Sequence, residues 1–140
     1  MNTADLKQFS LLADLAQEDL ELLRELLEER PLVSGQQLFR EEQEADGVLL
    51  LLSGTLRCQS EAEGALGTLV AGAELGVGAL VVPGPRAMTC VAEEASTVLL
   101  LTPTAFHRFA EDAPRAAVRV LEAAVRELSG TLREGLSYLR

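Results

Sequence analysis

The stretch LVAGAELGVGALVVPGPRAMTCVA, residues 69–92, carries the most specific pattern in this sequence of 140 residues. Gly76-Val77-Gly78-Ala79, with its small side chains, predicts a short helical turn whose first backbone amides are free to bind an anion. Arg86 and the small Ala87 follow on the next loop. Because an arginine can form two parallel hydrogen bonds to a phosphate, we expect these residues to form one anion-binding site.

The flanking sequence predicts β-structure around this stretch. Between residues 31 and 102, short apolar runs alternate with turn residues at intervals of roughly 8 to 12 residues, which is typical of an all-β barrel or sandwich. The segment 48–52 is apolar throughout and predicts a central strand. The segment 55–59 alternates between apolar and polar residues and predicts a strand with one solvated face.

Helices are predicted on both sides of this β-segment. Apolar residues recur at intervals of three and four over residues 4–29, which indicates a helical pair with a break at 14–18, ended by Pro31. Pro103 is placed to begin a helix that presents Phe106, and Pro114 is placed to begin a longer final helix.

The final helix carries an apolar seam at alternating intervals of three and four. Such a heptad pattern predicts packing against a second helix, and we expect a homodimer through this helix. The alternative is that the seam packs back onto the β-segment as ordinary core. The seam consists of Val118, Leu121, Val125, Leu128, Leu132 and Leu139.

Composition excludes several classes of protein. The net charge of −10 disfavours nucleic acids and anionic membranes, and the apolar runs are too short to span a bilayer. The N-terminus has no signal-peptide pattern, and two cysteines are too few for a disulfide framework, which favours a cytoplasmic protein. With one histidine in the sequence, we expect no metal site, no catalytic residue and no enzymatic activity.

An ordered series of short patterns resembles the cyclic-nucleotide-binding domain family, which includes the bacterial catabolite activators and the regulatory subunits of cyclic-AMP-dependent kinase. The series contains GAELGV at 72–77 and PRAMT at 85–89. Two family features precede these patterns: Gly35, and the segment from Asp46 to Gly54, which begins with an aspartate and ends with a Ser-Gly pair. Phe106 follows them. The resemblance covers about residues 5–138.

The resemblance implies a single domain with a mainly β fold. Its expected core is an eight-stranded double-stranded β-helix, or jelly roll, over residues 31–102, with a helical preamble at 1–30 and C-terminal helices at 103–140. A ligand pocket is expected inside this β-roll. Arg86 would bind the cyclic phosphate there, and Thr131 of the final helix would contact the base.

One position departs from the family pattern. Val77 stands where cyclic-AMP binders have a glutamate that accepts a hydrogen bond from the ribose 2′-hydroxyl, and an unmade bond of this kind costs about 1–3 kcal/mol. Arg86 would be costly to bury without a partner. Its partner could be a bound anion or the carboxylate of Glu74, Glu93 or Glu94, and the remaining alternative is a surface arginine on a loop.

These observations leave two functions open. The first is a non-catalytic regulatory sensor that binds a small anionic ligand, a cyclic nucleotide or another anion, and signals through its C-terminal helix to an effector protein. The second is a degenerate, ligand-free roll that acts as a homodimerisation or protein-interaction scaffold. Because no helix-turn-helix follows the final helix in this sequence, we expect no DNA binding.

Overall fold

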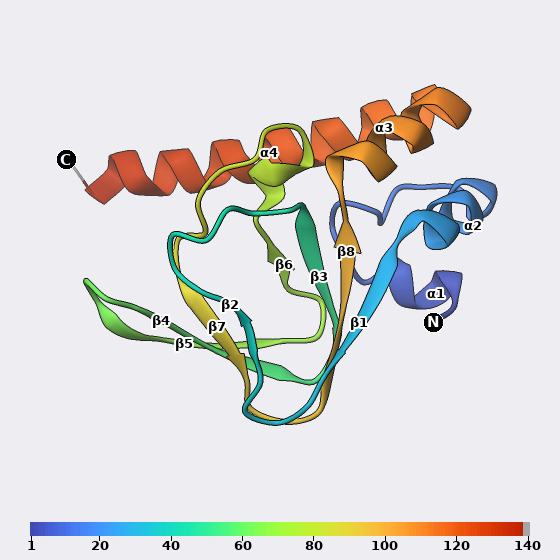
Figure 1. Cartoon of the computed structure of the whole chain (residues 1–140). Helices are drawn as coiled ribbons and strands as arrows, with labels where there is room; N and C mark the ends of the chain where they lie inside the picture. Colours follow the sequence, from blue (N-terminus) through green and yellow to red (C-terminus); the bar gives the residue numbers. More distant parts are fainter. Residues whose placement is uncertain (139–140) are drawn as a thin grey trace.

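Two four-stranded antiparallel sheets form a β-roll, with the C-terminal helices across one end and the N-terminal helices along one side, next to β1 (Figure 1). The computed structural model describes residues 1–138, and side chains through residue 133. The strand orders are β1-β8-β3-β6 and β2-β7-β4-β5, which confirms the predicted eight-stranded fold. The strands are β1 (Glu28–Leu32), β2 (Gln37–Phe39), β3 (Val48–Ser53), β4 (Thr55–Ser60), β5 (Gly64–Val70), β6 (Glu74–Leu75), β7 (Thr89–Ala92) and β8 (Ser96–Leu101). The helices are α1 (Thr3–Leu6), α2 (Gln17–Leu26), the 3₁₀-helix η1 (Val77–Leu80), α3 (Pro103–Asp112) and α4 (Pro114–Tyr138).

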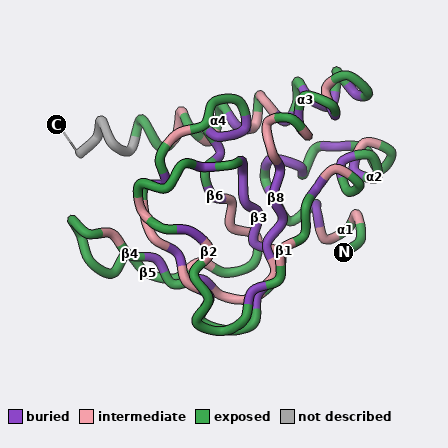
Figure 2. Tube along the Cα trace, in the orientation of Figure 1, coloured by how far each residue is buried: buried purple, intermediate pink, exposed green. Residues whose placement is uncertain are grey.

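Strand β3 separates two hydrophobic cores. It pairs with β8 on one side and β6 on the other, so it is the interior strand that its apolar sequence predicts. Because successive side chains of a strand point to opposite faces, Val48 and Leu50 pack beneath the helices, whereas Leu49 and Leu51 fill the roll. Burial in Figure 2 follows this division, with buried segments concentrated along β3 and β8.

Helices α3 and α4 begin where their prolines predict. The Thr102 side chain caps α3 by accepting a hydrogen bond from the Ala105 amide, and Pro103 occupies the first turn, where its missing N–H is not needed. Phe106 and Phe109 pack into the helical core with ring centroids 6.5 Å apart. Across the described residues, none of these helices has the length and apolarity that a membrane span requires.

The N-terminal segment differs from the predicted helical pair. Residues 7–14 form successive turns, in which Phe9 donates to the Leu6 carbonyl and Leu12 to the Phe9 carbonyl. The apolar period correctly identifies the buried side chains but not the backbone conformation, because repeated turns of three residues bury nearly the same positions. Pro31 lies within β1, a strand at the edge of its sheet where a missing donor is tolerated, and β1 begins three residues before the predicted boundary.

Most of the described seam of α4 is exposed. The helix packs on the roll mainly through small residues and one valine, with Leu121 of the seam packed against the same core, so the alternative in which the seam forms core holds for Leu121 alone among the described residues. Exposure reaches 61% at Val125 and 64% at Leu132. Val118 and Leu128 are exposed and Leu121 is half-buried, while Leu139 lies outside the described residues. The buried face consists of Ala116, Ala117, Val120 and Ala124.

Candidate functional site

The predicted helical turn is the 3₁₀-helix η1, which begins after Gly76. Gly76 has φ 71°, a left-handed conformation that glycine adopts without strain. The first turn closes where the Ala79 amide donates to the Gly76 carbonyl at 2.8 Å. The amides of Val77 and Gly78 precede this bond and therefore have no acceptor within the helix. This is the group of free donors that the sequence predicts.

The backbone of the next loop holds Arg86 in place. The Arg86 amide donates to the Gln43 carbonyl at 2.8 Å, and the Glu42 amide donates to the Arg86 carbonyl at 2.9 Å. These two bonds tie the loop before β7 to the loop after β2. The side chain consequently enters the roll, and Arg86 is only 5% exposed. The alternative of a surface arginine is therefore wrong.

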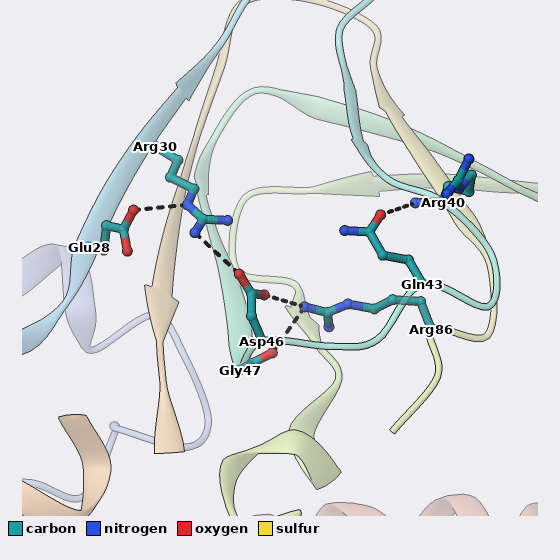
Figure 3. Close-up of polar contacts among 7 residues, drawn as sticks. All are labelled: Glu28, Arg30, Arg40, Gln43, Asp46, Gly47 and Arg86. Atoms are coloured by element: carbon teal, nitrogen blue, oxygen red, sulfur yellow. Dashed lines mark hydrogen bonds and ion pairs between the residues drawn. The ribbon is translucent and has the colours of Figure 1, made fainter. Parts of the chain in front are cut away.

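The Arg86 guanidinium is only partly satisfied by its neighbours (Figure 3). Its Nη2 donates to Asp46 Oδ1 at 3.3 Å and to the Gly47 carbonyl at 3.1 Å, and its Cζ lies 4.6 Å from the centre of the Phe39 ring. Nη1 is buried and has no hydrogen-bond partner. Burial lowers the pKa of Arg86, and the nearby Asp46 carboxylate opposes that effect.

The carboxylate that meets Arg86 is Asp46, and none of the three acids suggested by sequence proximity does so. Glu94 accepts a hydrogen bond from Thr55 at 3.1 Å, and Glu93 accepts one from Ser34 through its backbone carbonyl at 2.9 Å. The sequence does not identify Asp46 as the partner because it lies 40 residues before Arg86, and only the meeting of two loops brings them together. The one feature of the sequence that singles out Asp46 is that it begins the family-like segment that ends with the Ser-Gly pair at Gly54.

Asp46 is shared between two arginines. Its Oδ2 accepts from Arg30 Nη2 at 3.2 Å, and Arg30 Nε in turn donates to Glu28 at 3.1 Å (Figure 3). The result is a row of alternating charges that runs from the exposed edge strand β1 to the buried Arg86. Since Asp46 has a second cation, it can remain neutralised if Arg86 turns to another anion.

A cavity of about 330 Å³ opens beside Arg86. Its wall includes parts of the η1 segment, the loop that carries Arg86, and Phe39 of β2. No acidic side chain lines it among the residues that the structure describes. The lining residues are Phe39, Ala45, Leu75, Gly76, Gly78, Ala79, Val82, Gly84, Pro85, Arg86, Ala87 and Met88.

Of the six residues predicted to form the anion-binding site, five line this cavity and the sixth does not. The Val77 side chain is buried in the core beneath the helices, together with Leu80. Thr131 is also outside the lining: it is exposed, and its hydroxyl donates to the Glu127 carbonyl one turn earlier at 3.2 Å. The structure therefore brings together Gly76, Gly78, Ala79, Arg86 and Ala87, without the Val77 side chain or Thr131.

Glu74 serves a different purpose from the one the sequence suggests. Its carboxylate accepts from the Ser10 hydroxyl at 2.6 Å and from the Leu11 amide at 2.9 Å, and so joins β6 to the N-terminal turns. It also faces Glu127 of α4, one of whose oxygens is buried without a partner. Burial, followed by the charge of Glu74 and a hydrogen bond to it, raises the pKa of Glu127 to about 7.

This pair predicts a pH-dependent stability. Between about pH 4.5 and 7 the folded chain keeps the Glu127 proton, whereas the unfolded chain releases it, so the free energy of unfolding should fall as pH rises through this window. Urea titrations of the wild type and of Glu127→Gln measure the two free energies of unfolding. The difference between them should change with pH between about 4.5 and 7 and should stay constant above pH 7. Parallel pH curves for the two proteins would contradict the assignment.

Comparison with known proteins gives a consistent result. The model of the family "Cyclic nucleotide-binding domain" matches residues 29–113. The N-terminal domain of a transcriptional regulator from Streptomyces coelicolor A3(2) is 25% identical, with a TM-score of 0.82 over 93% of this chain and 94% of that one. A cyclic nucleotide-binding-like protein from Brucella abortus is 27% identical, with a TM-score of 0.69 over 79% and 97% of the two chains.

A third structure supports the fold. The catabolite activator protein of Thermus thermophilus is 24% identical, with a TM-score of 0.80 over 93% of this chain and 61% of that chain. No curated protein matches this sequence. Among the residues that the structure describes, no three His, Cys, Asp or Glu side chains gather in a way that could hold a metal ion.

Proposed function

Since the chain belongs to the cyclic nucleotide-binding domain family, whose domains are regulatory, we propose that its cavity binds a small phosphate-bearing ligand through Arg86 and the η1 amides. The binding signal passes to α4, which contacts η1 and presents an exposed apolar seam. The domain acts as a non-catalytic sensor and delivers this signal to an effector protein or to a second copy of itself.

The observation that carries this proposal is the buried Arg86 on the wall of a cavity. A guanidinium removed from water costs several kcal/mol unless its donors are satisfied, and Nη1 has no partner among the residues described. An anion in the cavity would supply the missing acceptor after a small rotation of the side chain. Gly78, whose amide has no acceptor within η1, lies on the cavity wall and can add a donor.

The cavity favours recognition of the phosphate over recognition of the ribose. Its lining combines one cation with apolar and glycine surfaces, and it contains no carboxylate to accept a hydrogen bond from a ribose 2′-hydroxyl. We therefore expect cyclic AMP and its 2′-deoxy form to bind with similar affinities. A site that held the 2′-hydroxyl would prefer the ribose form by about tenfold or more.

Isothermal titration calorimetry with cyclic AMP, cyclic GMP and 2′-deoxy cyclic AMP tests the proposal. Arg86→Met, which keeps the aliphatic stem and removes the charge, should weaken binding about tenfold to a hundredfold, because a charge-assisted hydrogen bond contributes about 1.5–3 kcal/mol. Arg40→Met is the matched control, since Arg40 is exposed and outside the cavity. Equal loss in both variants, or binding that Arg86→Met leaves unchanged, would contradict the site.

The alternative function is a ligand-free roll that acts as a homodimerisation or protein-interaction scaffold. Two observations favour it: Asp46 already neutralises Arg86, and the α4 seam leaves Val125 and Leu132 largely in solvent. An apolar heptad seam of this kind is stabilised when a second helix covers it. In the calorimetric experiment, this function predicts no heat of binding for the folded wild type with any of the three nucleotides.

A further inference from the structure

Two cysteines face each other inside the β-roll. Cys58 of β4 and Cys90 of β7 are direct register partners, and their sulfur atoms lie 3.1 Å apart. Both are free thiols and both are buried, at 3% and 0% exposure. Residues directly opposite in an antiparallel pair have Cα atoms about 4.5–5.5 Å apart, which is within the span of about 4.4–6.8 Å that a disulfide bridges.

The strands around the pair are irregular beside Cys58 and border the cavity beside Cys90. The β4–β5 ladder shifts register between Cys58 and Gln59, so the backbone beside Cys58 is already irregular. On the other side, Cys90 is opposite Phe39, whose ring lines the cavity and stacks on Arg86. A small oxidant that enters the cavity therefore comes close to the layer of side chains in which the thiols lie.

We propose that Cys58 and Cys90 are a redox modification site, at which a hydroperoxide converts the two thiols into an intramolecular disulfide between β4 and β7. One sulfur attacks the peroxide, breaks the O–O bond and becomes a sulfenic acid. The other sulfur then attacks it, so that the S–S bond forms and the S–O bond breaks with loss of water. Overall, two thiols lose two electrons and two protons, and hydrogen peroxide is reduced to two molecules of water.

The geometry affects the two steps differently. Burial, followed by the hydrogen bond to Cys58, raises the pKa of Cys90, and Arg86 opposes this effect. Attack by Cys90 in the first step is therefore slow at neutral pH, because the thiolate is the nucleophile. The second step is fast, because the partner sulfur is held in place by the register of the two strands. This combination favours a clean disulfide over further oxidation of either sulfur.

Peptide mapping of the full chain after treatment with excess hydrogen peroxide tests the proposal. The treatment continues until the half-exposed Met1 is converted to sulfoxide, which shows that oxidant was sufficient. Iodoacetamide is then added in denaturant, followed by trypsin. Because trypsin cleaves after Arg57, Arg86 and Arg108, we expect peptides 58–86 and 87–108 to be recovered as one linked species, short of two hydrogen atoms. Dithiothreitol should release the two peptides and restore alkylation of both.

The controls are Cys58→Ser and Cys90→Ser, checked for folding by circular dichroism and treated in the same way. Neither variant should yield the linked species within one chain. The proposal is overturned if wild-type peptides 58–86 and 87–108 remain fully alkylated when Met1 is oxidised. It is equally overturned if the cysteines gain oxygen atoms without losing two hydrogens, or if the link joins two chains. The wild-type result decides the question even if neither serine variant folds.

Discussion

Replacing Gly47 with alanine should destabilise the chain by about 3 kcal/mol, the upper end of the cost of overpacking a fixed interior. A Cβ atom at this position would overlap the Leu101 carbonyl oxygen and lie 2.9 Å from its carbonyl carbon and 3.0 Å from Thr102 Cα. These are backbone atoms at the junction of β8 and α3, so no side-chain rotation can relieve the overlap. The Gly47 carbonyl also accepts from Arg86, so the substitution should weaken the anion site as well.

Chemical denaturation of Gly47→Ala beside Gly84→Ala measures this effect. A Cβ at Gly84 would meet no atom within 4 Å, so this control adds the same methyl group in open space and should change the free energy of unfolding by less than about 1 kcal/mol. Similar free energies of unfolding for the two variants would show that the approach of Leu101 to Gly47 does not constrain the fold.

Val77→Glu should destabilise the chain by about 3–5 kcal/mol at pH 7. The sequence pattern alone makes this substitution look like the restoration of a ribose-binding carboxylate. The structure instead places the Val77 side chain, 7% exposed, in the core beneath the helices. A carboxyl group buried among aliphatic side chains has its pKa raised by up to several units, and each unit corresponds to about 1.4 kcal/mol. The loss should be smaller at pH 4, where the carboxyl is mostly protonated even in the unfolded chain.

Gly78→Glu is the matched control for this prediction. Gly78 is exposed on the cavity wall, and a Cβ there meets no atom within 4 Å, so the added carboxylate stays in water. Its free energy of unfolding should fall by less than about 1 kcal/mol and should depend little on pH. If Val77→Glu were as stable as Gly78→Glu and bound cyclic AMP more tightly than wild type, Val77 would face the ligand after all.

The sequence predicts the strands well because their signals are local. The apolar run 48–52 and the alternation at 55–59 each reflect which faces of a strand are buried, and β3 and β4 follow both patterns. The prediction of a helix for the N-terminal turns is wrong because a local pattern reports burial and not the backbone conformation. A period of three to four residues reports which side chains are buried, and turns of three residues bury nearly the same ones.

Some features of the candidate site could likewise be predicted from the sequence, and others could not. Gly76 and Arg86 could be identified from the sequence because a short turn and a nearby arginine require particular residue types at a short separation. The direction of the Val77 side chain could not, because one face of η1 borders the cavity and the other is buried against the helices. A 3₁₀-helix has three residues per turn, so neighbouring residues face different sides, and a shift of one position decides whether a side chain meets the cavity or the helices.

By itself, the sequence determined a β-segment between helices, a short turn after Gly76 and an arginine that follows it, since these follow from local periodicity, glycine and charge, while the resemblance to a known family implied the eight-stranded roll. Only the tertiary structure decided what those residues meet. Asp46 reaches Arg86 across 40 positions, and Cys58 meets Cys90 across 32. Such partners are set by how loops and strands pack against each other, and local periodicity does not report which residues so far apart in the chain will meet.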